Sequence, residues 1–169
     1  MSLIRSARGY TPKIHPSVFL AESANIIGDV EIAEGSSVWY QTVLRGDVMP
    51  IRIGAATNIQ DGSIIHGTFG KFGVTIGSEV TIGHQVVLHG TSVSDKCLVG
   101  MGSILMDGSF IASNCIVGAG SLVTEGFRCD EEGWLVLGRP AKKIRKLKDE
   151  ELSFLKQSAD NYRLYQTWY

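Results

Sequence analysis

Large aliphatic residues recur every six positions along most of this chain, and that period constrains the fold more than any other feature. Between residues 76 and 123, with one interval of five, they are Ile76, Ile82, Leu88, Val93, Val99, Leu105, Ile111, Val117 and Val123. A helix spaces apolar residues by three or four and a strand by two, so a sustained period of six indicates short strands separated by fixed corners. Small or β-branched residues follow four positions later and are expected to point inward too: Val80, Val86, Ser92, Cys97, Ser103, Ser109, Cys115 and Ser121.

The same period starts at Ile14 and runs to Leu44, resumes at Ile53 after Pro50, and is interrupted again at residues 67–73. Three glycines mark that second interruption, the insertion loop, as an exposed loop. Three hexads make a coil of 18 residues, so the recurring residues sort into three columns, one for each face of a triangular prism. Coils of this kind stack about 4.8 Å apart. We therefore predict an all-β solenoid.

The period also divides the chain into segments. Residues 1–13 show no period and are expected to form an N-terminal arm, followed by the solenoid at 14–126. Residues 127–148 are expected to form an irregular return segment, because Pro140 opposes regular structure and Cys129 falls outside the repeat. Apolar residues spaced by three and four then predict a C-terminal α-helix over 149–169, with Asp149 as its N-cap.

Composition excludes several classes of partner. The net charge of −1 gives no footprint for nucleic acid, and the basic residues between 142 and 148 are interpreted as a solvated linker. No stretch approaches the roughly 20 apolar residues that span a bilayer, and the first residues lack the apolar region of a signal peptide. We expect a soluble cytoplasmic protein without membrane or nucleic-acid partners, with Cys97 and Cys115 as reduced core thiols.

Three of the four histidines lie within 24 residues and occupy related positions in the coils. His66 and His89 each directly follow a residue of the third column and are 23 residues apart, which is one coil plus the five inserted residues. Their side chains should therefore be neighbours on consecutive coils, with Arg45 at the same corner one coil earlier. His84 lies on the preceding face, where Asp61 has the equivalent position one coil before it.

A symmetric neighbour could bring its His84 against the His66 and His89 of this chain, and three such sites would form around a threefold axis. Three imidazoles with an open fourth position are a ligand set of catalytic zinc. The same geometry makes Arg45 face the neighbour's Asp61, which predicts an ion pair between subunits. The alternative is that these are unrelated surface histidines without a metal, as we interpret His15.

Five short motifs, in this order, resemble the gamma-class carbonic anhydrases and their bacterial and plant homologues: Arg45-Gly46-Asp47, Asn58-Ile59-Gln60-Asp61-Gly62, His66, Ile82-Gly83-His84 and Leu88-His89-Gly90. The resemblance covers residues 14–162. It implies a left-handed parallel β-helix of hexapeptide repeats and a homotrimer. It also implies a zinc ion, with iron or cobalt as alternatives, bound by His66 and His89 of one subunit and His84 of the next.

The resemblance also suggests roles for the surrounding residues. Gln60 matches a glutamine that hydrogen-bonds the attacking hydroxide, and Arg45 and Asp61 match an ion pair between subunits. Asp47 belongs to the same motif as Arg45. Tyr162, near the end of the expected helix, resembles a tyrosine close to the metal. The implied reaction is the reversible hydration of carbon dioxide to bicarbonate.

The sequence departs from this family at the residues that export protons. Where the best-studied enzyme has glutamates, this chain has Val48 after Asp47 and an insertion loop without carboxylates. We therefore expect slow hydration. Two alternatives remain open: a hexapeptide acyltransferase or other enzyme acting on acyl-CoA, suggested by the Gly138–Ala141 segment, and a metal-binding structural trimer with little turnover.

Overall fold

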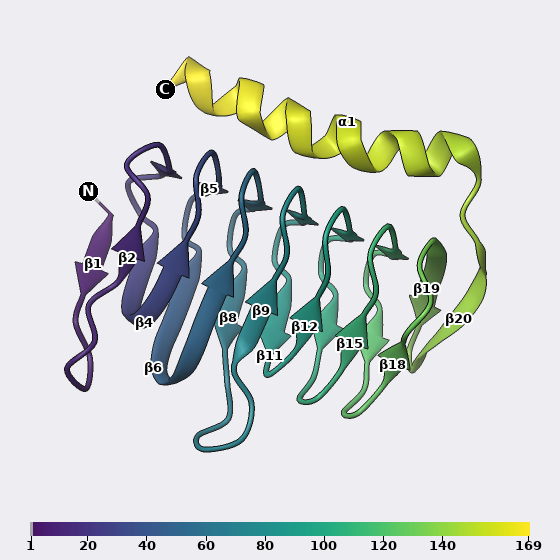
Figure 1. The fold of residues 1–169 in the computed structure, drawn as a ribbon, viewed down its shortest axis with the longest axis horizontal. Coiled ribbons are helices and arrows are strands. Elements are labelled where there is room, and N and C mark those ends of the chain that lie inside the picture. Colours follow the sequence, from purple (N-terminus) through teal and green to yellow (C-terminus); the bar gives the residue numbers. More distant parts are fainter. Residues whose placement is uncertain (1) are drawn as a thin grey trace.

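The computed structural model describes residues 2–169 and shows a stack of coils with three flat faces, with one helix lying along the stack (Figure 1). One face is an eight-stranded sheet of β3 (Phe19–Leu20), β5 (Ser37–Val38), β7 (Asn58–Ile59), β10 (Thr81–Ile82), β13 (Leu98–Val99), β16 (Ile116–Val117), β19 (Trp134–Gly138) and β20 (Ala141–Lys146). The other two faces share a twelve-stranded sheet, because two long strands, β4 (Asn25–Ile32) and β6 (Val43–Ile53), continue from one face to the next.

The remaining strands of the larger sheet are short and fall into two rows. One row contains β2 (Lys13–Ile14), β9 (Val74–Ile76), β12 (Ser92–Val93), β15 (Phe110–Ile111) and β18 (Arg128–Cys129). The other contains β1 (Leu3–Arg5), β8 (Ile64–His66), β11 (Val87–His89), β14 (Ile104–Leu105) and β17 (Leu122–Val123).

The three predicted columns are confirmed by the strand register. In the third column Leu44 pairs with Ile65, Ile65 with Leu88, and Leu88 with Leu105, all in parallel strands. The column residues are almost completely buried and form one continuous core. Burial of these apolar side chains in one core is the main contribution to the stability of the fold.

One inward position was predicted incorrectly. In the coil with the five-residue interval the inward residue is Thr91, which is buried and shares a hydrogen bond with Ser109, whereas Ser92 pairs with Thr75.

Within residues 1–13, predicted as an N-terminal arm, β1 pairs in parallel with β4. The arm therefore begins as a strand of the solenoid sheet.

Residues 127–148 are not irregular. Cys129 is buried and pairs with Ile111, so it continues the first column. β19 then runs parallel to β16, and β20 turns back antiparallel to β19. The sequence pattern missed this region because the last coil contains one extra residue, which places Val136 opposite Val117. Pro140 causes no conflict, since it lies between the two strands.

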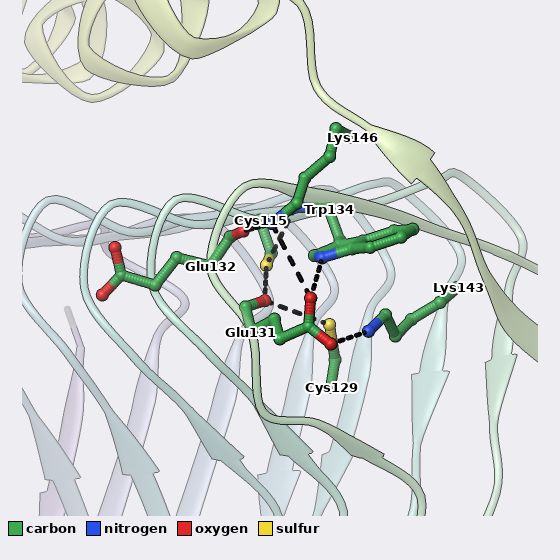
Figure 2. A network of polar contacts seen from close by, with 7 residues as sticks. All are labelled: Cys115, Cys129, Glu131, Glu132, Trp134, Lys143 and Lys146. Atoms are coloured by element: carbon green, nitrogen blue, oxygen red, sulfur yellow. Dashed lines mark hydrogen bonds and ion pairs between the residues drawn. The ribbon is translucent and has the colours of Figure 1, made fainter.

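The last coil is held together by Glu131. Its carboxylate accepts hydrogen bonds from Trp134 Nε1 at 3.1 Å and from Lys143 Nζ at 2.7 Å (Figure 2). Its backbone oxygen accepts from the thiols of Cys115 and Cys129. Lys143 also lies 4.1 Å from the centre of the Trp134 ring, a cation–π distance. One residue thus links the core cysteines to the terminal hairpin.

The helix α1 (Asp149–Tyr165) returns along the solenoid toward its N-terminal end (Figure 1) and is followed by the short 3₁₀ helix η1 (Gln166–Trp168). Its N-cap is Lys148, one residue before the expected Asp149, and the Glu151 carboxylate accepts the Lys148 backbone N–H at 2.8 Å. Leu155 and Ala159 are buried against the solenoid. Within residues 2–169, no helix has the length and apolar character needed to cross a bilayer.

Two adjacent isoleucines on β4 test the column assignment. Ile26 is fully buried in the core and Ile27 is only partly buried. Ile26→Ala should lower the free energy of unfolding by about 2–5 kcal/mol, because it leaves a cavity in a continuous core. Ile27→Ala should cost about 1 kcal/mol. Urea denaturation of both variants measures the difference, and equal losses would contradict the assignment.

Candidate metal centre

The strand register places two of the predicted ligands side by side. His66 ends β8 and His89 ends β11, and they lie opposite each other in the parallel pairing of these strands. His66 Nδ1 and His89 Nε2 face each other at 3.4 Å. Two nitrogens bound to one tetrahedral zinc ion at about 2.0–2.1 Å are about 3.3–3.4 Å apart. The spacing of the two ring nitrogens is therefore that of two ligands of one metal ion.

A carboxylate lies behind each of these two histidines. Asp47 Oδ1 is 2.9 Å from His66 Nε2, and Asp107 Oδ1 is 2.7 Å from His89 Nδ1. An ionised carboxylate only accepts hydrogen bonds, so each outer nitrogen carries the proton and each inner nitrogen presents a lone pair. Two lone pairs at this distance repel each other unless a proton or a metal ion lies between them. These residues therefore fit a metal ion.

Both carboxylates are held in the ionised form. Burial alone would raise the pKa of Asp47, but hydrogen bonds from Arg45 and His66 outweigh it and hold that pKa below its usual value. Burial likewise acts to raise the pKa of Asp107, and hydrogen bonds from Thr68 and His89 lower it overall. Hydrogen bonding from a carboxylate to the outer nitrogen fixes the tautomer and orientation of a histidine ligand.

The third predicted ligand lies elsewhere. His84 follows β10, and its Nδ1 is 2.9 Å from Asp61 Oδ2, with both side chains more than two-fifths exposed. Across residues 2–169 of a single chain, no three histidine, cysteine or acidic side chains cluster closely enough to hold a metal ion. Each chain therefore presents a histidine pair on one corner and a single histidine, also backed by a carboxylate, on another.

Arg45 is paired within its own chain. Its guanidinium is 2.6 Å from Asp47 Oδ2, so it supports the carboxylate that orients His66. The ion pair between Arg45 and Asp61 of a neighbouring subunit remains a prediction. In the single chain, Asp61 instead contacts His84.

Gln60 is fixed by a line of buried amides and hydroxyls. Its Nε2 donates to Asn58 Oδ1 at 3.0 Å, and Asn58 Nδ2 donates to Thr81 Oγ1 at 3.0 Å. The Thr81 hydroxyl shares a 3.1 Å hydrogen bond with Ser158 of α1. The amide of Gln60 is thus oriented from the helix through two side chains. Asn58 stood within a recognised motif, but its positioning role was not anticipated.

Tyr162 of α1 lies close to Asp61, and its place near a metal ion stays a prediction. Both line a cavity of about 350 Å³ whose other walls are aromatic: Trp39, Tyr40, Tyr165, Trp168 and Tyr169. The Tyr162 ring meets Trp39 edge-on at 5.3 Å. Burial, followed by the nearby Asp61 charge and Tyr165, raises the pKa of Tyr162 to about 12. At neutral pH the phenol is therefore a hydrogen-bond donor.

Asp107 was missed by the sequence analysis. It follows His89 by 18 residues, one coil, so the column arithmetic contained the signal. Asp107 lies two places after Leu105, whereas the other residues predicted at this corner, Arg45, His66 and His89, directly follow their column residues.

No protein-family model matches the chain. It is 50% identical to Protein YrdA of Escherichia coli over 166 residues, covering 95% of this chain and 90% of that protein. It is 42% identical to a carbonic anhydrase of Geobacillus kaustophilus, covering 95% and 87%. It is 47% identical to mitochondrial gamma carbonic anhydrase 1 of Arabidopsis thaliana, covering 89% of this chain and 56% of that protein.

A solved structure extends the comparison. A hexapeptide transferase family protein from Anaplasma phagocytophilum superposes with a TM-score of 0.94 at 41% identity, covering 99% of this chain and 98% of the other. The predicted left-handed parallel β-helix with a C-terminal helix is confirmed. The chain belongs to the gamma carbonic anhydrase-like family of hexapeptide-repeat proteins.

The ionisation of Tyr162 gives a test of its environment. Phenolate absorbance should show fewer tyrosines titrating between pH 10 and 11 in the folded protein than in the unfolded protein, because the pKa of Tyr162 is raised to about 12 and that of Tyr40 is raised as well. Tyr162→Phe should remove the group that titrates near pH 12. Since the folded state retains this proton longer, the group's contribution to stability should decline as pH rises from about 10 to about 12. A Tyr162 titrating at its ordinary pKa would contradict the buried placement.

Proposed function

We propose that this protein is a zinc-dependent, gamma-class carbonic anhydrase-like enzyme that reversibly hydrates carbon dioxide to bicarbonate. The observation that carries the proposal is the 3.4 Å approach of His66 Nδ1 and His89 Nε2, each with a carboxylate behind the ring. Iron or cobalt could replace zinc, because imidazole suits several transition metals. The proposed compartment is the cytoplasm, where reducing conditions keep cysteines such as the three buried free ones in the thiol form.

The proposed assembly is a homotrimer with the metal sites between subunits. The histidine pair offers two ligands, and His84 of a neighbouring subunit would supply the third. In this arrangement each histidine is oriented by a carboxylate of its own chain: Asp47, Asp107 or Asp61. The pairing of Arg45 with Asp61 across the interface belongs to the same proposal, and it would require Arg45 to bridge Asp47 and the neighbour's Asp61.

The metal would supply a nucleophile at neutral pH by lowering the pKa of water to about 7. Residues of the chain would orient the nucleophile and form hydrogen bonds around it. Gln60, fixed through Asn58, would orient the nucleophile by a hydrogen bond. Tyr162, in the aromatic cavity that Asp61 also lines, would donate a hydrogen bond to the substrate or product, because its raised pKa keeps the phenol protonated.

Mixed trimers test the shared site. Wild-type protein should elute at three times the chain mass by light scattering and bind about one zinc ion per chain. His66→Ala and His84→Ala should each lose most of the metal, and His15→Ala should retain it as a control. When the two deficient variants are refolded together, some interfaces regain all three histidines, so part of the metal should return. Demonstrated subunit exchange without recovery would contradict the shared site.

Proton export is the step at which this chain is expected to differ from the best-studied gamma-class enzyme. Val48 is partly exposed and lines a cavity of about 220 Å³ together with Asp47, Arg8 and Phe69. The wall next to Asp47 thus carries an apolar side chain where a proton acceptor would be useful. Hydration should therefore be slow and should increase with buffer concentration.

Val48→Glu supplies the missing group. It should raise the hydration rate at low buffer by about tenfold, equivalent to about 1.4 kcal/mol of barrier, and reduce the dependence on buffer. Val48→Gln is the matched control, because it has similar size and no titratable proton. Stopped-flow hydration assays measure both. Equal rates for the two variants at full metal content would show that proton export is not limiting.

The second candidate is an acyltransferase or another enzyme acting on acyl-CoA. It is favoured by the high structural similarity to a protein of the hexapeptide transferase family. The third candidate is a metal-binding trimer with a structural role. Absence of hydration at every buffer concentration, in protein with full metal content, would favour one of these, and an acyl-CoA transfer and hydrolysis assay would separate them.

A further inference from the structure

Asp107 joins two parts of the molecule that are far apart in sequence. It lies in the turn between β14 and β15, and only about a fifth of its side chain is exposed. Oδ1 is 2.7 Å from His89 Nδ1, and Oδ2 accepts a hydrogen bond from Thr68 Oγ1 at 2.5 Å. One oxygen thus orients a member of the histidine pair, and the other holds the insertion loop.

The contacts around Asp107 leave little freedom. A Cβ added at Gly90 would lie 2.2 Å from Asp107 Oδ1 and 2.8 Å from Phe72 Cβ, and Gly90 has a φ of +59°. Glycine is therefore required for the carboxylate and the loop to approach the histidine together. Thr68 also exchanges backbone hydrogen bonds with Phe72, at 2.9 and 3.1 Å, which closes the loop on itself. The loop is closed by its own hydrogen bonds, and its Thr68 hydroxyl is bonded to Asp107.

The two histidines of the pair are supported differently. Asp47, behind His66, lies on the long strand β6 and is held by Arg45 of the same strand. Asp107, behind His89, receives its second hydrogen bond from the insertion loop. Of the two supporting carboxylates, only Asp107 is therefore bonded to the insertion loop.

We propose that Asp107 is a positioning residue for His89 and that it couples docking of the insertion loop to metal binding at the histidine pair. The proposal rests on the metal-binding function proposed above. A docked loop donates the Thr68 hydroxyl and fixes the carboxylate, which presents His89 Nε2 to the metal. Because coupling between two equilibria is reciprocal, a bound metal stabilises the docked loop to the same extent.

Zinc affinity measured by competition with a chelator tests the first half of the proposal. Asp107→Asn should weaken binding by about 10- to 100-fold, as expected for the partner of a histidine ligand. Thr68→Val removes only the hydroxyl and should weaken binding by about two- to tenfold, while Thr68→Ser should restore it. The double variant should bind no more weakly than Asp107→Asn, because both changes remove one linkage. Thr167→Val and Asp130→Asn, changes of the same chemistry outside the loop and the histidine pair, are the controls.

Hydrogen exchange at the loop tests the second half without reference to activity. Zinc should slow the exchange of the Thr68, Lys71 and Phe72 amides in the wild type and should have little effect on them in Thr68→Val. Thermal melting of the metal-free Thr68→Val and Asp107→Asn variants should show that both variants remain folded. The coupling would be overturned if Thr68→Val bound zinc as tightly as the wild type and if zinc slowed the exchange of its loop amides as much as in the wild type. The positioning role would be overturned if Asp107→Asn bound zinc as tightly as the wild type.

The outcomes separate this inference from the proposed function. If wild-type protein binds zinc and the variants respond as expected but carbon dioxide is not hydrated, the coupling holds and the proposed reaction fails. If His89→Ala abolishes binding while Asp107→Asn and Thr68→Val do not weaken it, the metal site holds and the coupling fails. If wild-type protein binds no zinc, iron or cobalt, both are overturned.

Discussion

The register of parallel strands determines both the core and the site of this protein. Because each coil stacks directly on the one before it, the neighbours of a residue are the residues one coil away in either direction. This rule aligns the column residues into one apolar core, and it brings His66, His89 and Asp107 together on three successive coils. A slip of one residue would turn inward side chains outward and would separate the two histidines in the same step.

The regular part of the fold and the histidine pair could be predicted from the sequence because the register follows from spacing alone. The prediction failed where a coil has a different length. One hexad, between Leu88 and Val93, has five residues in place of six, and there Thr91 takes the inward position that was predicted for Ser92. In the last coil, one extra residue hid the pairing of Val117 with Val136. Spacing places Asp107 one coil after His89 but gives no side-chain direction, so the hydrogen bonds of Asp107 to His89 and of Arg45 to Asp47 came only from the structure.

Each of the three histidines assigned to the proposed site has a carboxylate within 2.9 Å of one ring nitrogen. Neutral imidazoles bring no charge to a divalent ion, so these carboxylates are the groups that would balance it at short range. They differ in attachment: Asp47 is part of a long strand, Asp61 follows β7, and Asp107 is tied to a loop. Affinity for the ion can therefore change through the loop without any change in the ligands.

The terminal hairpin has a consequence for how copies of this chain can associate. A solenoid of parallel strands exposes unpaired backbone groups at its ends, where another copy could add and continue into a fibre. Here β20 runs antiparallel to the coils and closes the eight-stranded sheet, and its sequence carries four basic residues at positions 142, 143, 145 and 146. Like charges on two such strands would oppose end-to-end contact. The strand that ends this sheet therefore opposes contact between the C-terminal ends of two copies, whereas a stack of regular coils alone would present an uncharged edge there.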